Sequence, residues 1–385
     1  MNEALRKIIE GDNTPAYIFD INVLKRRVEY LQGKMPKDTK LCYAIKANTF
    51  IVKYIENDVD RFEVCSPGEY EICKCKNMDK EKILISGVYK TPEVIKNMII
   101  NDGITNLTIE SMEQFKLIKG LNCKNKLKLL LRLTSGNQFG INEEEIEEIL
   151  KKRNEYENIK ITGIQYFSGT QKVSLKNLKR ELDYVDGVIE NIKEKYNFTF
   201  EELEFGPGFP VHYFQNDEFD EDIFLTEFAT MLSEMKFKGK KILEIGRSIA
   251  ASCGKYITKV VDMKINRGQN YAILDGGIHH LIYYGQSMAM KIPKCKVYPE
   301  RENSEDERWN LFGSLCTIND ILVKQFPVSN LKIGDVFVFQ NTGAYCMTEG
   351  ISLFLSRKLP KVIIVKENRE IESVREHIDT YKLNM

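Results

Sequence analysis

Short apolar runs alternate with longer polar or amphipathic stretches from about residue 40 onward. Runs of this length, rich in Ile, Leu and Val, are typical of buried strands. The predicted strands are Leu41–Lys46, Arg61–Ser66, Ile83–Ser86, Asn106–Glu110, Leu127–Thr134, Ile161–Phe167, Leu203–Phe209 and Lys241–Gly246. The first five begin about 21 residues apart, which leaves room for a strand, a helix and two turns.

The stretches between these runs carry the pattern of helices, with apolar residues three or four positions apart. Examples are Thr91–Ile100, Met112–Lys119, Glu143–Lys152 and Leu175–Lys195. Strands that alternate with helices in this way predict an α/β fold, and eight of them predict a (β/α)8 TIM barrel. An open, doubly wound sheet of about six or seven strands is the alternative.

The pattern changes after Arg247, where helical signals fade and strand-like segments crowd together. These segments are Tyr256–Ile265, Tyr271–Leu274, Asp335–Phe339 and Lys361–Val365. We therefore expect a barrel over residues 26–250 and a mostly β domain, a sandwich or small barrel, over residues 251–385. The early strand Ala16–Asp20 precedes the barrel, so residues 1–25 are expected to pair with the β domain.

Composition excludes several classes of protein. Lys+Arg and Asp+Glu both number 56, so no net charge draws the chain to nucleic acid or to a membrane surface. No stretch is apolar and long enough to span a bilayer, and residues 1–13 lack the apolar core of a signal peptide. The nine cysteines are dispersed without the spacing of a metal site, which indicates reduced thiols, no metal and a cytoplasmic location.

Functional groups of a parallel barrel gather at the C-terminal ends of its strands. Reading those ends gives Lys46, Cys65, Arg132, Phe167, Thr170, Gly206, Gly208, Glu244, Gly246 and Arg247. Each has a structural interpretation when taken alone: a lysine extends to water, a glycine bends a strand into a loop, and an acid pairs with a neighbouring base. Together these residues are more specific evidence for a functional site than any one of them.

A lysine at the mouth of the barrel, kept partly neutral, can form an imine with an aldehyde. Glycine turns at successive strand ends leave backbone amides uncovered for a phosphate, and Arg247 adds positive charge. Glu244 closes an apolar strand, where a protonated pyridine nitrogen would satisfy it. An imine-forming lysine, a phosphate site and an acid for a ring nitrogen together indicate pyridoxal 5'-phosphate.

The motifs resemble a known family, the fold-type III pyridoxal-phosphate enzymes with an alanine-racemase-like barrel, and within it the amino-acid decarboxylases of diaminopimelate and ornithine. The matching segments are Tyr43-Ala44-Ile45-Lys46-Ala47-Asn48, the strand-six segment from Gly163 to Gln171, Gly206-Pro207-Gly208, Glu244-Ile245-Gly246-Arg247, Asp275-Gly276-Gly277, Cys316-Thr317-Ile318-Asn319-Asp320 and Gly343-Ala344-Tyr345. They stand in the family's order from Tyr43 to Tyr345, over nearly the whole chain.

The resemblance implies a role for each matching position. Lys46 would form the imine with the cofactor, and Glu244 would face the pyridine nitrogen. The other cofactor contacts, mostly at the phosphate, would be Arg132, Phe167, Thr170, Gly208, Gly246, Arg247 and Tyr345. Cys316 would come from a partner subunit and return a proton to the α-carbon. The family's enzymes are homodimers with shared active sites, so this chain is expected to form one.

Two positions depart from the family's pattern. Phe167 stands where a histidine usually stacks on the pyridine ring, so an aromatic face remains and the imidazole charge is lost. Thr317 follows the cysteine, where decarboxylases of diamino acids carry an acid that binds the substrate's distal ammonium. The Cys-Thr-x-x-Asp segment from Cys316 to Asp320 resembles a branch of the family that includes a decarboxylase of glutamyl units tethered to a carrier protein. Thr317 and Asp320 are the expected substrate contacts.

The sequence therefore predicts decarboxylation of an α-amino acid or of an aminoacyl group tethered to a carrier protein. Three alternatives remain open at this point. One is a decarboxylase of diaminopimelate or ornithine, with the distal amine held by another acid such as Glu349. Another is an amino-acid racemase of the same superfamily, although racemases usually place arginine rather than glutamate against the ring nitrogen. The third is a non-catalytic regulator, although such proteins typically lose the lysine or the cysteine.

Overall fold

The structure, a computed structural model, describes residues 3–305 and 307–385. They fold into two compact units. The first consists of Val28–Pro210 and Phe219–Ile249; the second consists of the chain up to Arg27, Val211–Glu218 and Ala250–Met385. Residues 211–218 thus belong to the second unit although they lie within the span expected for the barrel, and the first two residues of the expected segment 1–25 lie outside the described residues.

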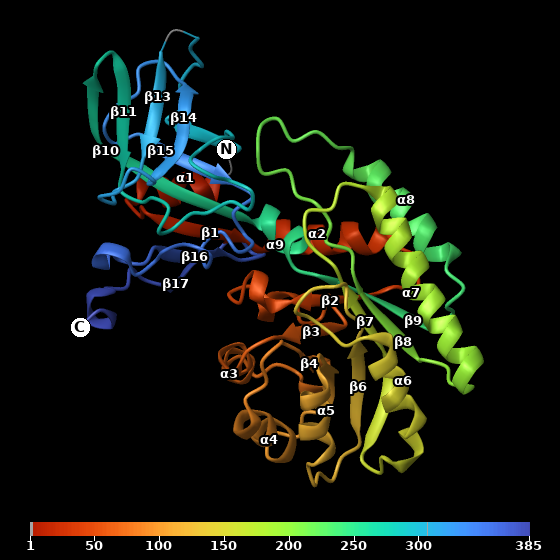
Figure 1. The fold of residues 1–385 in the computed structure, drawn as a ribbon. Coiled ribbons are helices and arrows are strands. Elements are labelled where there is room, and N and C mark those ends of the chain that lie inside the picture. Colours follow the sequence, from red (N-terminus) through yellow and green to blue (C-terminus); the bar gives the residue numbers. More distant parts are fainter. Residues whose placement is uncertain (1–2, 306) are drawn as a thin grey trace. The chain divides into compact units, whose positions relative to one another are not determined.

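The first unit is built on a closed barrel of eight parallel strands (Figure 1). They are β2 (Lys40–Ala44), β3 (Arg61–Val64), β4 (Ile83–Ile85), β5 (Asn106–Ile109), β6 (Leu127–Arg132), β7 (Ile159–Phe167), β8 (Glu202–Gly206) and β9 (Lys240–Ile245). The barrel closes where β2 pairs with β9, with Cys42 opposite Glu244. The predicted TIM barrel is confirmed, and the open sheet is wrong because such a sheet leaves its first and last strands unpaired.

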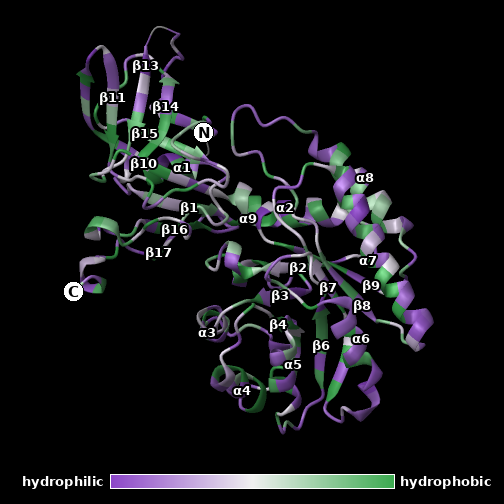
Figure 2. Ribbon diagram, viewed as in Figure 1, coloured by the Kyte–Doolittle hydropathy of each residue, from purple (hydrophilic) through white to green (hydrophobic). Residues whose placement is uncertain are grey.

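Helices connect the strands along the outside of the barrel, because parallel strands need a crossover between them (Figure 1). The connecting helices are α3 (Pro67–Cys75), α4 (Pro92–Ile100), α5 (Met112–Lys119), α6 (Glu143–Lys151), α7 (Leu175–Tyr196) and α8 (Glu221–Glu234). α2 (Ile21–Lys34) precedes the first barrel strand, and the short α9 (Arg247–Ala250) follows the last. Figure 2 shows β6 mostly hydrophobic, whereas α7 and α8 mix hydrophobic and hydrophilic residues. This difference is expected for a strand buried on both faces and for helices with one solvent-exposed face.

Seven of the eight barrel strands end earlier than the apolar runs predict, and β7 ends at Phe167 as predicted. β2 stops at Ala44, and Lys46 lies on a single 3-10 turn, Ile45–Ala47, closed by a hydrogen bond from the Asn48 amide to the Ile45 carbonyl at 3.0 Å. The reason is that residues at the C-terminal ends leave the ladder to form the loops of the barrel mouth. The candidate residues therefore lie either at the ends of strands, as Arg132, Phe167 and Glu244 do, or on the turns that follow them.

The second unit is a sheet of nine strands, ordered β14-β13-β11-β10-β1-β16-β17, with β15 paired to β10 and β12. The strands are β1 (Ala16–Asp20), β10 (Gly254–Asn266), β11 (Gln269–Leu274), β12 (Cys295–Tyr298), β13 (Arg308–Phe312), β14 (Ile321–Pro327), β15 (Val336–Gln340), β16 (Lys361–Val365) and β17 (Ile371–Arg375). β1 lies antiparallel to β10 and parallel to β16, so the start of the chain completes this sheet.

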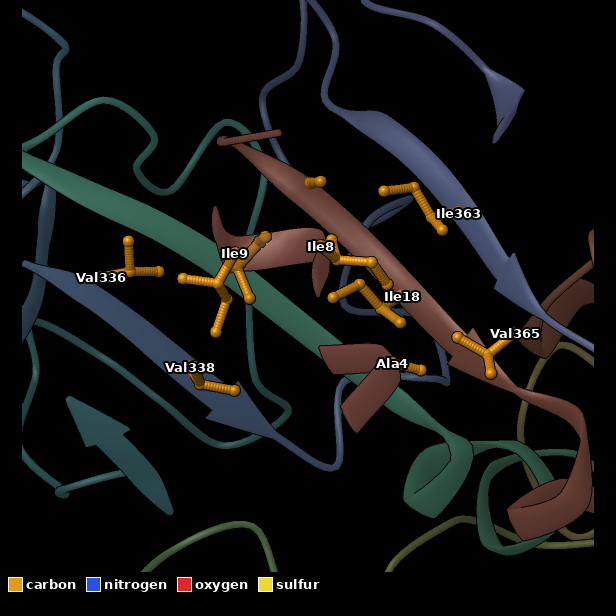
Figure 3. Close-up of a cluster of buried hydrophobic side chains, with 10 residues drawn as sticks. Ala4, Ile8, Ile9, Ile18, Val336, Val338, Ile363 and Val365 are labelled. Carbon is orange, nitrogen blue, oxygen red and sulfur yellow. The ribbon is translucent and has the colours of Figure 1, made fainter. Parts of the chain in front are cut away.

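A helix at the start of the chain, α1 (Glu3–Glu10), packs on the sheet of the second unit. Ala4, Ile8 and Ile9 are its buried face. Figure 3 shows this face against side chains from β1, β15 and β16. Together with Ile257 of β10 they form one hydrophobic cluster: Ala16, Ile18, Ile257, Val336, Val338, Ile363 and Val365. Burial of these aliphatic side chains orders the chain's first residues against strands more than 300 residues away.

No helix within residues 3–305 and 307–385 has both the length and the apolar character needed to cross a membrane.

Candidate active site

The ammonium group of Lys46 lies between two buried carboxylates of the barrel. Lys46 Nζ forms a short ion pair with Glu63 Oε2 and lies 3.6 Å from Glu244 Oε1. The Lys46 side chain is 38% exposed, whereas those of Glu63 and Glu244 are 2% and 8% exposed. The lysine thus reaches solvent while both acids belong to the barrel interior, and Cys65 Sγ lies 3.6 Å from the same nitrogen.

The two acids share a hydrogen bond and differ in protonation. Burial alone would raise the pKa of Glu63, but the charge and hydrogen bond of Lys46, with the hydrogen bond from Glu244, lower it to about 2. Burial and the neighbouring charge of Glu63 raise the pKa of Glu244 well above its usual range, despite Lys46. Glu63 is therefore the charged partner of Lys46, and Glu244 is the acid of the pair that retains the shared proton more readily.

A second site lies where β7, β8 and β9 end. Gly208 has a φ of +61°, and a Cβ there would lie 2.1 Å from the carbonyl oxygen of Gly169, so only glycine fits. Arg247 donates from Nε to Thr170 Oγ1 at 3.1 Å. Thr170, Gly208 and Arg247 are thus brought together, with a hydroxyl and a guanidinium beside uncovered backbone. These are groups suited to a phosphate.

Three predicted contacts of the barrel remain: Arg132 and Phe167 end β6 and β7, and Gly246 lies between β9 and α9. Arg132, the last residue of β6, forms a buried ion pair with Glu110 at 2.9 Å. Phe167 ends β7 with its ring against Gly206, where a Cβ would lie 2.4 Å from Phe167 Cδ2. The ammonium of Lys172 lies 6.0 Å from the Phe167 ring centroid, so a cation stands near the ring that occupies the family's histidine position.

The predicted residues of the second unit lie in two loops. Cys316 is exposed and Thr317 half-buried, in the loop between β13 and β14. Asp320 ends that loop and is fully buried; its two carboxylate oxygens accept from the amides of Ile278 and Leu315, each at 2.7 Å. Tyr345 is half-buried after β15 and has a φ of +64°. Asp320 therefore shapes the cysteine loop, and both its oxygens are already bound by protein.

The motifs did not single out Glu63, Glu110, Gln165 or Glu204, which the barrel places among the predicted residues. A signal for them exists in the sequence. Glu63 interrupts the apolar strand Arg61–Val64 and Glu204 interrupts Glu202–Gly206, and a carboxylate buried in a barrel strand requires a cation or a donor. The sequence alone does not say which partner each one takes.

Comparison with known proteins identifies relatives over most of the chain. Residues 21–251 match the family described as pyridoxal-dependent decarboxylase, pyridoxal binding domain. The chain is 27% identical to 2-[(L-alanin-3-ylcarbamoyl)methyl]-2-hydroxybutanedioate decarboxylase of Staphylococcus aureus, covering 92% of this chain and 95% of that protein. It is also 27% identical to the L-glutamyl-[BtrI acyl-carrier protein] decarboxylase of Niallia circulans, covering 94% and 91%.

Solved structures share the fold. The crystal structure of diaminopimelate decarboxylase from Helicobacter pylori complexed with L-lysine superimposes with a TM-score of 0.84 at 20% sequence identity. The alignment covers 98% of each chain, so both the barrel and the β unit have counterparts in that enzyme.

Proposed function

Because this chain belongs to the family of pyridoxal-dependent decarboxylases, as its motifs predicted, we propose that it releases carbon dioxide from an α-amino acid or a carrier-bound aminoacyl group at the Lys46 site. Pyridoxal 5'-phosphate is the cofactor of the family. The observation that carries the proposal is Lys46 Nζ, held at the barrel mouth between Glu63 and Glu244. The cofactor, when bound, accepts the electron pair left on the α-carbon as the carboxylate departs.

The residues of the barrel fit this cofactor. Lys46 Nζ must lose a proton before it can bond to an aldehyde carbon, and the carboxylate of Glu63 is the charged group in direct contact with it. Burial and the charge of Glu63 raise the pKa of Glu244, so its carboxyl group is suited to share a proton with a ring nitrogen. The remaining proposed contacts are Arg132 and Phe167, and at the phosphate Thr170, Gly208, Gly246, Arg247 and Tyr345.

Cys316 is the group proposed to return a proton to the α-carbon from a partner subunit. Its exposure supports this role, because an exposed thiol can be presented to a second copy of the chain. Ile318, two residues later, is 83% exposed, and large exposed apolar side chains also occur at Ile351, Leu353, Phe354 and Leu355. Apolar side chains of this size are usually covered, which favours a homodimer.

Thr317 points to the substrate class. Its hydroxyl is neutral and cannot form a charge-assisted bond with a distal ammonium, so we propose a substrate without one. The names of the two sequence relatives support this, because an alanin-3-ylcarbamoyl compound and a glutamyl-carrier protein both lack a distal amine. Other relatives are named diaminopimelate decarboxylase, so a diamino acid is the competing candidate for the substrate. Since Asp320 is bound to backbone amides, we assign it to the loop rather than to the substrate.

A panel of amino acids, with and without loaded acyl-carrier proteins, tests the proposal by mass spectrometry of the products. Glutamyl units, β-amides of diaminopropionate, diaminopimelate and ornithine belong in the panel. The expected product has lost the mass of carbon dioxide, and the expected substrates lack a distal amine. Turnover restricted to diamino acids would overturn the substrate class, and exchange at the α-carbon with the carboxylate retained would indicate a racemase.

Lys46→Ala is the variant that tests the cofactor site. It should lose both activity and the visible absorbance of the lysine-bound cofactor, because no other group is proposed to bond to the aldehyde. Lys96→Ala, an exposed lysine on α4, is the matched control and should retain both. A visible band that survives unchanged in Lys46→Ala would contradict the assignment of Lys46.

A further inference from the structure

A glutamine at the centre of the barrel joins the Lys46 site to a second buried carboxylate. Gln165 lies on β7 and is fully buried. Its Nε2 donates to Glu244 Oε2 and to Glu204 Oε1, each at 3.0 Å. Both hydrogens of the amide nitrogen are therefore used, one for each carboxylate.

The amide oxygen of the same side chain is unpaired. Gln165 Oε1 has no hydrogen-bond partner within residues 3–305 and 307–385. A buried acceptor without a partner destabilises a fold, so the side chain is held in this orientation by what its nitrogen binds. The two carboxylates thus determine the orientation of Gln165.

Glu204 is held in turn from the opposite end of the barrel. Arg61, the first residue of β3, donates from NH1 to Glu204 Oε2 at 2.8 Å and from NH2 to Glu202 at 3.0 Å. Arg61 lines a depression of about 330 Å³ at the N-terminal ends of the strands, together with Lys128, Lys160, Glu202 and Lys240. A continuous set of contacts therefore runs from this depression through Glu204 and Gln165 to Glu244.

These contacts distinguish the two oxygens of Glu244. Oε2 accepts from Gln165, and Oε1 is the oxygen that lies 3.6 Å from Lys46 Nζ. We propose that Gln165 is a positioning residue, held by Arg61 through Glu204, that binds Oε2 of Glu244 so that Oε1 faces the ring nitrogen of the cofactor. This inference rests on the proposed role of Glu244 at that nitrogen.

The charges around Glu244 agree with this arrangement. Glu63 on β3, Lys46 after β2 and Glu204 on β8 face it, and burial with the charge of Glu63 raises its pKa. Because the nitrogen of Gln165 can only donate to Oε2, the proton of Glu244 belongs on Oε1. Oε1 is thus the atom that holds the proton in contact with the Lys46 site.

The test measures affinity for pyridoxal 5'-phosphate, by titrating the apoenzyme, and the pH dependence of the bound cofactor's visible absorbance. Gln165→Met keeps the length of the side chain and removes the donor. It should weaken cofactor binding about tenfold, the effect of losing one hydrogen bond, and move the absorbance profile along the pH axis. Arg61→Met should do the same to a smaller extent, and Arg61→Lys should restore part of the loss.

A matched control and a double variant isolate the route of the effect. Lys160→Met lines the same depression but its lysine pairs with Glu201 rather than with Glu204, so it should leave affinity and absorbance unchanged. In the Glu244→Gln background, Gln165→Met should have no further effect, because both act through one carboxylate. Thermal midpoints show which variants fold. If Gln165→Met does not fold, the comparison of Arg61→Met with Arg61→Lys still tests the proposal.

The outcomes separate the two levels of the proposal. If Glu244→Gln changes neither affinity nor absorbance, the role of Glu244 itself is wrong. If Glu244→Gln changes both, but Gln165→Met has no effect or adds fully to it, the positioning role of Gln165 is wrong. An equal effect of Lys160→Met would show a general response to charge at the barrel end and would also overturn it.

Discussion

Glu244 lowers the stability of the barrel when it is ionised, because its carboxyl group is buried beside the charge of Glu63. Burial and the charge of Glu63 raise its pKa well above the ordinary value of 4.5. A carboxyl group of this kind contributes stability that is present below the unfolded-state pKa and is lost as pH rises through the folded-state pKa. Glu63 behaves in the opposite way: its pKa of about 2 contributes stability above 4.5 that is lost on acidification.

Replacing Glu244 with glutamine should therefore raise stability and lower function. The new amide can still donate to Glu63 and accept from Gln165, and it has no acidic proton to lose. We expect the apoenzyme to gain ~1 kcal/mol at pH 8 relative to the natural protein, the usual size of such stabilisation. The gain should shrink towards pH 4.5, where a protonated Glu244 is no longer at a disadvantage.

Thermal midpoints of the two apoenzymes across this pH range check the prediction, beside their affinities for pyridoxal 5'-phosphate. A loss of stability at pH 8 would mean that Glu244 is ionised and paired in the apoenzyme. That result would contradict the assignment of the shared proton to Glu244.

At the scale of the element, the turn after β8 should tolerate no side chain at Gly208. Gly208→Ala forces a Cβ against the Gly169 carbonyl in a left-handed conformation, so we expect a loss of about 1 to 3 kcal/mol in stability and weaker cofactor binding. The matched control is Gly33→Ala on α2, where nothing lies within 4 Å of the added carbon. It should stabilise the protein by ~0.5 to 1 kcal/mol. Equal effects of the two changes on cofactor affinity would contradict the proposed phosphate site.

The loop after β11 contains two adjacent buried histidines that should make the β unit sensitive to acid. His279 and His280 have ring centroids 3.8 Å apart. His280 Nε2 donates to the Lys358 carbonyl at 2.7 Å, so Nδ1 accepts from the Tyr256 hydroxyl at 3.1 Å. Burial and the adjacent His279 lower the pKa of His280 to about 3, and burial lowers the pKa of His279 to about 4.

Histidines with lowered pKa values contribute stability above their unfolded pKa of 6.5 that is lost as pH falls towards 4 and 3. His280→Gln keeps a donor and cannot be charged. We expect the variant to be less stable than the natural protein at pH 7.5. As pH falls towards 3, the free energy of unfolding of the variant should rise relative to that of the natural protein by on the order of 2 to 4 kcal/mol. Calorimetry at several pH values measures this difference, and two parallel stability curves would contradict it.

The whole molecule is proposed to function as a pair of chains. If the Cys316 of one chain serves the Lys46 of the other, mixing Lys46→Ala with Cys316→Ala should restore activity, because half of the dimers are mixed and each has one intact site. We expect about a quarter of the natural activity after subunit exchange. Gel filtration gives the oligomeric state in parallel. No recovery in a proven mixture of dimers would mean that each chain supplies its own cysteine.

The regular spacing of strands and helices was enough to predict the barrel, since burial on both faces leaves an unbroken apolar run in each strand. The same approach missed β12, β13, β14 and β17, although β1 and β16 matched their predicted bounds. The missed strands are short, irregular or partly exposed, as in β17, and their pairing carries register shifts in β13, β14 and β17. The pattern of apolar and polar residues cannot reveal a strand whose extended conformation depends mainly on pairing with adjacent strands.

The sequence by itself determined the barrel, the family and the position of Lys46, because strand and helix periods and a contiguous motif are local properties of the chain. Only the tertiary structure decided that Lys46 contacts Glu63 and Glu244, that Gln165 joins Glu244 to Glu204, and that Asp320 supports the loop of Cys316. These partners lie on different strands and loops. Their contacts depend on how the barrel closes and on the register between strands, which no short segment of sequence contains.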